Sequence, residues 1–380
     1  MGLALGLILP GIEGEYQVAA DRAVDVLKVV GLGVLSVATL IFSLLFLVVQ
    51  WAAGNFSHRL VLFRSDPVVW RAFALVVGLL VFSVTATLAI GARPTVSVVV
   101  PVTAVVLSAA ALVLVRRLLL NALRSIQLAH VLSDVRKRGR EVLRAVYPPP
   151  NGTDGDAPEG GGVRRLPDVT STVVWPGDTV LVAQVDLLRL IRAATEADAV
   201  VVLKAPVGTL LYTGDVVAEV RGGRLPDAEV LRAVVAELER TFHQDPTFAF
   251  RLLCDIGLRA LSPAINDPAT AVQVLDAVED LLRLIASADL GDRSIADEAG
   301  AVRVVMRLPS WDEFVRVGFD DLCRAASDAP MVLSRAGELL RRLQEVAQQR
   351  RRRSLQERLI WVEKELAGRH PAFVYESAGR

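Results

Sequence analysis

The sequence predicts an α-helical membrane domain followed by a cytoplasmic α+β domain, and two observations lead to this fold class. Three runs without a charged residue lie in the first third of the chain, at Val29–Val49, Ala72–Ile90 and Val96–Val115. Each run is about 19–21 residues long, or roughly 28–32 Å as a helix, which is enough to cross a hydrocarbon core of about 30 Å. The charged residues lie mostly after Arg116, so we expect residues 1–115 to form the membrane domain.

The three runs should be helices, because a backbone in lipid must satisfy its own hydrogen bonds. The segment before them, Met1–Pro10, is also apolar but is too short to span a bilayer. It lacks the basic start and the small-residue cleavage site that signal peptides carry. We therefore predict three transmembrane helices preceded by an apolar N-terminal stub.

The placement of arginines predicts the orientation of these spans. The turn Gly91–Thr95 holds only Arg93, whereas six arginines flank the opposite ends of the runs: Arg59, Arg64, Arg71, Arg116, Arg117 and Arg124. Basic residues are enriched in cytoplasmic loops. The sequence thus predicts a multi-pass protein of the inner membrane whose C-terminal domain faces the cytoplasm.

The chain after the third run divides by composition. Apolar residues at helical spacing continue the third span as a stalk over 116–147, and a Pro- and Gly-rich flexible linker follows at 148–162. Short β-like runs with Gly-containing turns predict a small β-rich module over 163–225. Amphipathic patterns, beginning with Asp227–Phe242, predict a helical bundle over 226–370, before a tail at 371–380.

Within this helical region the sequence predicts further helices and one strand. The segment Ala301–Leu308 is compatible with a strand that rejoins the β module. The predicted helices are Phe248–Leu261, Ala269–Ala286, Asp312–Ala326, Val332–Arg351 and Leu355–Leu366.

Composition and motifs do not indicate an enzyme. The chain carries 42 basic and 42 acidic residues, so a zero net charge gives no overall attraction to nucleic acid. The two cysteines suggest no disulfide framework. No histidine stands in metal-ligand spacing with another His or Cys, and no phosphate-binding loop or nucleophile elbow is present. We expect no catalytic residue, metal or cofactor, and no nucleic-acid partner.

A stripe of polar residues follows the first span. Ser36, Ser43 and Gln50 recur every seven residues and therefore share one helix face. Polar residues in spans tend to face the bundle interior or a wet path. Two interpretations stay open, namely contacts that hold the three helices together and the lining of an oligomeric pore.

The densest signal lies between Gln244 and Ala271. Arg251, Asp255 and Arg259 are spaced i, i+4 and i+8, so Asp255 can pair with both arginines. Ser262 precedes a proline that ends this helix, and Asn266 or Asp267 should cap the next one, which begins at Pro268. One interpretation is a polar pocket between two helix ends, and the other is a structural corner held by caps and ion pairs.

This stretch resembles the signature of the DUF2254 family of bacterial predicted membrane proteins, to which no function is assigned. The matching residues are Gln244-Asp245, Arg251, Asp255-Ile256, Arg259-Ala260-Leu261-Ser262-Pro263, Ile265-Asn266-Asp267-Pro268 and Thr270-Ala271. Further matches occur at Phe42-Ser43, Gln50, Phe56-Ser57, Arg59 and Ser125-Ile126-Gln127. The resemblance implies a membrane location and this architecture but no reaction.

From these features we expect an oligomeric membrane assembly or channel whose cytoplasmic domain gates or senses. Its expected partners are the lipid bilayer and further copies of itself, and the sequence identifies no small-molecule or ion ligand. The alternative is a membrane-anchored scaffold or signalling module that transports nothing. The basic run Arg350–Arg353 suits either anionic lipid or a solvated helix face.

Overall fold

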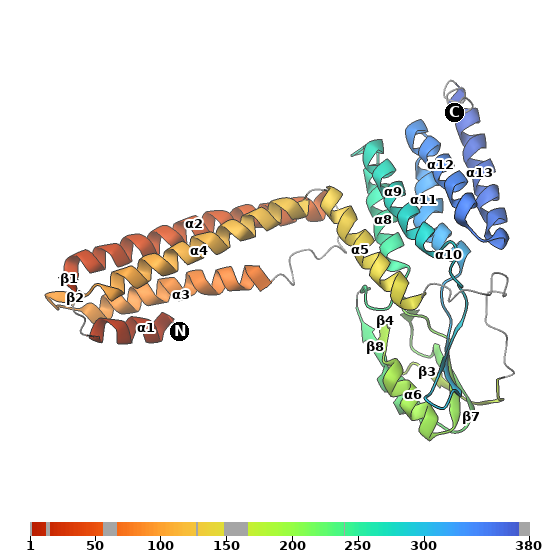
Figure 1. Ribbon diagram of the computed structural model, residues 1–380, viewed down its shortest axis with the longest axis horizontal. Coiled ribbons are helices and arrows are strands. Elements are labelled where there is room, and N and C mark those ends of the chain that lie inside the picture. Colours follow the sequence, from red (N-terminus) through yellow and green to blue (C-terminus); the bar gives the residue numbers. More distant parts are fainter. Residues whose placement is uncertain are drawn as a thin grey trace. The chain divides into compact units, whose positions relative to one another are not determined.

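The computed structural model describes residues 2–12, 16–55, 67–126, 128–147, 166–238 and 240–371 (Figure 1). It consists of two compact units, Met1–Val131 and Leu132–Arg380. The predicted linker at 148–162, most of the tail at 371–380, and Arg59, Arg64 and Gln127 lie outside the described residues.

The first unit is helical. Its helices are α1 (Gly2–Ile8), α2 (Ala20–Asn55), α3 (Pro67–Ile90) and α4 (Val99–Ile126). By length and composition, three stretches of these helices can cross a membrane: Ala20–Leu44, Trp70–Ile90 and Val99–Leu120. The prediction of three apolar helices near the N-terminus, followed by a mixed helical and sheet region, is confirmed.

Small residues form much of the contact between α2, α3 and α4. Seven alanines in these helices are buried: Ala20, Ala23, Ala38, Ala72, Ala86, Ala104 and Ala111. In a membrane, small side chains let helix backbones approach closely, because lipid gives no hydrophobic drive for association. The predicted stub forms α1, which packs on α3 so tightly that a Cβ at Gly6 would lie 1.8 Å from the Thr85 hydroxyl oxygen.

A two-stranded sheet closes one end of this unit. Strand β1 (Gln17–Ala19) pairs antiparallel with β2 (Thr95–Ser97), and the Thr95 hydroxyl donates to the Gln17 side-chain oxygen at 2.6 Å. The start of α2 and the start of α4 are therefore tied together at the same end as the turn after α3. The sequence patterns did not predict these strands, which are each only three residues long.

The second unit begins within α5 (Leu128–Val146) and continues into two sheets (Figure 1). One sheet has the strand order β3-β7-β5-β10-β9, and the other has the order β6-β4-β8. The strands are β3 (Val169–Val174), β4 (Val180–Val185), β5 (Ala199–Leu203), β6 (Leu210–Leu211), β7 (Val216–Gly222), β8 (Val234–Glu237), β9 (Arg293–Ala296) and β10 (Val302–Met306). Two short helices, α6 (Leu187–Glu196) and α7 (Asp227–Ala233), accompany them.

Two predictions about this region have different outcomes. The strand expected within Ala301–Leu308 is confirmed, since β10 pairs in parallel with β5. The helix predicted over Asp227–Phe242 is wrong in its second half, because α7 ends at Ala233 and Val234–Glu237 pairs antiparallel with β4. The open edge of β4 offers backbone partners to a Val-Val pair of high β propensity, and this long-range pairing overrides the local amphipathic pattern.

The remaining helices form a bundle. They are α8 (Phe248–Ala260), α9 (Pro268–Ile285), α10 (Trp311–Val315), α11 (Asp321–Ala325), α12 (Pro330–Val346) and α13 (Gln349–Arg369), and a π-helical turn, η2 (Arg316–Asp320), joins α10 to α11. The break between the last two helices falls at Ala347–Gln348 rather than after Arg351. Gln348 makes this break because its backbone and side-chain amides donate to the Ala286 and Ser287 carbonyls.

Candidate functional site

The polar stripe of α2 lies on the exposed surface of the helical unit. Ser36, Ser43 and Gln50 are all exposed, whereas Val34 and Ala38 form the buried face. The Ser36 hydroxyl donates to the Leu32 carbonyl of its own helix at 2.9 Å. The interpretation that the stripe holds the three helices of one chain together is therefore wrong, because these side chains do not pack between them.

Helix register places Gln50 near an end of the span. The rings of Phe42 and Phe73 pack edge to face with centroids 6.0 Å apart, so these residues lie at the same depth. Gln50 is about 12 Å further along α2, while α3 extends only about 9 Å beyond Phe73 to Pro67. The part of the stripe within the apolar span consists of the Ser36 and Ser43 hydroxyls.

In the second unit, Gln244 joins the loop before α8 to a sheet. Its side-chain oxygen accepts from the Val185 N–H at 2.9 Å, and its side-chain amide donates to the Val185 carbonyl at 3.1 Å. Both backbone groups at the end of β4 are satisfied by this one side chain. The Gln244 side chain thus makes the two hydrogen bonds that a neighbouring strand would make. An amide is needed here because it both donates and accepts.

Asp245 is buried beside this contact and is only 2% exposed. One carboxylate oxygen accepts from the Thr247 backbone amide at 3.0 Å and from its hydroxyl at 2.8 Å, and the other lies 3.2 Å from Arg240 Nε. Burial raises the pKa of the Asp245 carboxyl, and Arg240 opposes this shift. Arg240 also donates to the Gly208 carbonyl at 2.9 Å.

Gly208 leaves the space that the Asp245–Arg240 pair occupies. Its φ of +88° lies in the left-handed region, and a Cβ there would lie 2.5 Å from the second Asp245 carboxylate oxygen. The turn before β6 therefore needs glycine both for its backbone and for the space that the Asp245–Arg240 pair occupies. The glycine-containing turns that the sequence predicts in the β-rich module give no sign of this contact with Asp245.

The predicted ion network on α8 is formed in part. Arg251 Nε lies 3.1 Å from an Asp255 carboxylate oxygen. Arg259 makes no ion pair with any described residue, and its Nε is buried without a hydrogen-bond partner among them. The expectation that Asp255 also pairs with Arg259 is therefore wrong, although the helical spacing allows it.

The turn between α8 and α9 is stabilised by short-range side-chain contacts. The Ser262 hydroxyl donates to the Arg259 carbonyl at 2.7 Å, and Asn266 takes a left-handed φ of +47°. Asp267 is the N-cap of α9 and accepts from the backbone amide and the hydroxyl of Thr270 at 3.0 and 2.6 Å. These bonds lower the pKa of the Asp267 carboxyl. The predicted cap is confirmed, and these contacts support the structural corner over the polar pocket.

A buried arginine that sequence reasoning missed joins α13 to α9. Arg351 is 3% exposed and donates to the carbonyls of Ile285, Ala286 and Ala288 at 2.9, 2.9 and 2.7 Å. Its guanidinium lies 5.3 Å from the centre of the Trp311 ring. The proposed lipid-facing or solvated use of Arg350–Arg353 therefore does not apply to Arg351.

A signal for Arg351 exists in the sequence. Buried positions of α13 recur at helical spacing, and Arg351 continues the stripe formed by Leu355, Leu359, Val362 and Leu366. A basic residue in line with an apolar face is buried unless it lies beyond the end of the core. Here it is buried because the carbonyl end of α9, where the helix dipole is negative, lies against it.

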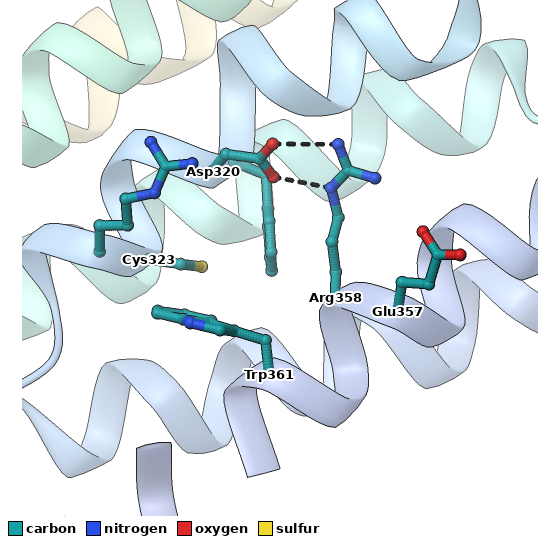
Figure 2. A pocket seen from close by; sticks show the side chains of 7 residues that line it. Asp320, Cys323, Glu357, Arg358 and Trp361 are labelled. Carbon is teal, nitrogen blue, oxygen red and sulfur yellow. Dashed lines mark hydrogen bonds and ion pairs between the residues drawn. The ribbon is translucent and has the colours of Figure 1, made fainter. Parts of the chain in front are cut away.

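A pocket of about 280 Å³ lies in this bundle. Figure 2 shows Arg358 at this pocket, with its guanidinium paired to Asp320. The two side chains form hydrogen bonds of 2.7 and 3.0 Å, and both Cys323 and Trp361 line the same hollow. Burial raises the pKa of the Cys323 thiol well above its usual range and that of Cys254 to about 12. Thiols that stay protonated are not activated nucleophiles.

The part of the chain that the structure describes offers no metal centre. None of its His, Cys, Asp and Glu side chains form a group of three or more that could hold an ion. Gln244, Asp245, Arg251, Asp255, Ser262 and Asp267 of the signature each bond to another group of this chain through their side chains.

Comparison with known proteins places this architecture in a family. Uncharacterized proteins of Mycobacterium tuberculosis (strain H37Rv) and Mycobacterium bovis are each 27% identical to the chain over 362 residues, which are 90% of this chain and 69% of each relative. No solved structure matches it. The family model described as "Predicted membrane protein (DUF2254)" matches residues 1–342. The chain therefore belongs to the DUF2254 family of predicted membrane proteins.

Proposed function

We propose that this protein is an oligomeric assembly of the inner membrane, a channel whose cytoplasmic unit senses a signal and gates the spans. The observation that carries the proposal is the connection of α4 to α5 along the chain. The third candidate span, Val99–Leu120, lies within α4, which ends at Ile126, and α5 begins at Leu128. We therefore propose that a displacement of α5 is passed along the chain to α4.

Helix α5 is itself part of the core of the second unit. A Cβ at Gly139 would lie 2.7 Å from Ala249 Cβ and 3.2 Å from a Leu281 methyl group, so α5 fits against α8 and α9 without free space. Arg140 adds an ion pair of 2.9 Å with Asp280. Well-packed interiors transmit displacements, because they are close-packed and incompressible. A rearrangement of α8 and α9 would thus be passed to α5 and onward to α4.

The exposed serines of α2 support oligomerisation. Ser36 and Ser43 lie seven residues apart on a face that no described helix of the same chain covers. Small hydroxyl residues at this spacing favour close packing between helices in lipid. The arginine distribution supports an orientation with the second unit in the cytoplasm. A second candidate, a non-transporting scaffold, uses the same contacts without a pore.

Flux through reconstituted vesicles tests the channel and its coupling. We expect wild-type protein to conduct ions, and Gly139→Leu to change this flux at least several-fold, because leucine cannot fit against Ala249. The matched control is Ser133→Leu, an exposed position on the same helix, which should leave flux unchanged. Oligomers that conduct no ions under any ionic condition would contradict the channel and favour the scaffold.

Cysteine cross-linking tests the oligomer separately. Ser43→Cys should form a disulfide-linked dimer in membranes, while the native Cys254 and Cys323 are buried and should contribute no background. Val106→Cys, at a position of α4 that is 61% exposed, serves as the comparison. Equal cross-linking at both positions, or none at Ser43, would contradict an interface along the stripe.

A further inference from the structure

We infer that the membrane unit binds one anionic phospholipid in a groove between α2 and α3. The groove has a volume of about 250 Å³ and is open along one side. Its walls are nearly all apolar, and its lining residues are Leu27, Lys28, Gly31, Leu32, Leu80, Ser83, Val84, Thr87 and Leu88. The inference depends on the membrane location of this unit but not on ion conduction.

Lys28 supplies the charge that a lipid phosphate would meet. It is the one charged residue among those that line the groove, and it forms no ion pair with any described residue. An ionisable residue within a membrane helix is costly unless it has a partner or reaches the interface. The apolar groove beside Lys28 and the lack of a carboxylate partner in the described chain favour an anionic headgroup as that partner.

Ser83 lines the groove, and its hydroxyl has no hydrogen-bond partner among the described residues. Six other hydroxyls of α2, α3 and α4 donate to a carbonyl three or four residues earlier in their own helix: Ser36, Thr39, Thr85, Thr87, Thr103 and Ser108. Ser83 is only 4% exposed, yet its oxygen has no hydrogen-bond partner. A buried hydroxyl without a partner is destabilising, because it has lost its bond to water and gained none in return. An ester carbonyl in the groove would accept this hydrogen bond.

The depths of Lys28 and Ser83 match the order of groups in a glycerophospholipid. Gly31 faces Ser83, since a Cβ at Gly31 would lie 3.1 Å from the Ser83 oxygen. Lys28 is three residues, or about 4.5 Å, closer to the start of α2, which is the end closed by β1 and β2. A phosphate at Lys28 therefore places the glycerol esters near Ser83, and the acyl chain then runs along Leu32 and Leu80 toward the bilayer centre.

Native mass spectrometry of the full chain in detergent tests this site with phosphatidylglycerol and phosphatidylcholine of identical acyl chains. We expect one phosphatidylglycerol to bind about tenfold more tightly than phosphatidylcholine, and Lys28→Gln to reduce this preference to about twofold or less. The matched control is Arg22→Gln, which removes one positive charge from the same helix outside the groove and should keep the preference. Loss of preference in both variants, or in neither, would overturn the site.

Two further measurements distinguish the contribution of the acyl chain to binding from that of the headgroup. Val84→Trp, at a groove residue that is 51% exposed, should block the groove from its rim and weaken binding of both lipids several-fold. Glycerol phosphate, which lacks acyl chains, should not compete with the lipid. Displacement of phosphatidylglycerol by glycerol phosphate would show that Lys28 binds phosphate alone and would overturn the assignment of the groove. Unchanged melting temperatures of the variants confirm that they are folded.

Discussion

The two units of the chain satisfy their polar groups in different ways. In the helical unit, six helix hydroxyls donate to carbonyls of their own helix, and alanines make much of the contact between helices. In the second unit, buried and half-buried polar side chains reach elements that are distant in sequence. Arg351 bonds to the end of α9 and Gln244 bonds to β4.

This difference is what we expect if the first unit lies in lipid and the second in water. A helix in lipid has no water to satisfy its polar groups, so each helix must be complete before it packs, and only shape remains to select its neighbours. An element in water can leave its ends unsatisfied until another element supplies the partner. Size changes should therefore matter most in the first unit, and removal of a polar side chain should matter most in the second.

The largest effect is expected for Arg351→Ala. This change leaves the carbonyls of Ile285, Ala286 and Ala288 without their buried donor, and we expect a loss of about 3–5 kcal/mol in the free energy of unfolding. Arg353→Ala is the control, since that side chain is 89% exposed and pairs with Glu357 on its own helix. We expect this change to cost less than about 0.5 kcal/mol. Urea unfolding followed by tryptophan fluorescence measures the stability of both variants. Equal losses would show that the buried bonds of Arg351 do not stabilise the second unit.

The next largest loss in the free energy of unfolding is expected for Gln244→Glu. The carboxylate cannot donate to the Val185 carbonyl, so we expect a loss of about 2 kcal/mol. Gln356→Glu provides the control, because the Gln356 side-chain oxygen accepts from Gln344 and a carboxylate can still do so. A stability of Gln244→Glu within error of the control, in the same urea experiment, would show that the signature glutamine does not hold the sheet.

Ala104→Leu tests how sensitive the helical unit is to an increase in side-chain size. Ala104 is fully buried, and the added methyl groups should overpack the helix contact at a cost of about 1–3 kcal/mol. Ala109→Leu adds the same volume at an exposed position of α4 and should leave the melting temperature in detergent unchanged. Tolerance of leucine at Ala104 would mean that close helix approach does not select this packing.

The smallest effect is a pH dependence within the second unit. The raised pKa of Asp245 means that the folded protein holds this proton more tightly than the unfolded chain. Its contribution to stability should therefore fall as pH rises from the ordinary value of 3.8 toward the raised pKa, and Asp245→Asn should remove this slope. Thermal melts over a pH series measure the difference between the two proteins.

Asp267 gives the matched comparison of opposite sign. Its pKa is lowered by the bonds from Thr270, so its contribution is present above 3.8 and is lost as pH falls through the lowered pKa. Asp267→Asn should therefore be less stable than the wild type above pH 3.8, and this difference in stability should disappear in acid. The same direction of change for both variants would contradict the assignment of burial as the dominant cause at Asp245.

The sequence alone determined the parts of this protein that depend on local pattern. Long uncharged runs gave three apolar helices, and the Asn-Asp-Pro motif gave the cap of α9 at Asp267. The i, i+4 spacing also gave the Arg251–Asp255 pair. These features depend on residues within about one helical turn, or on total hydrophobicity, and both can be read along the chain.

Only the tertiary structure decided which elements those residues meet. Strand β8 forms because β4 has an open edge, and Arg351 is buried because the end of α9 lies against it. The serine stripe of α2 is exposed because Val34 and Ala38 occupy the packed face instead. Arg259 has the same spacing from Asp255 as Arg251 has, yet only Arg251 forms the ion pair among the described residues. Spacing permits a pair, and the surrounding packing determines whether it forms.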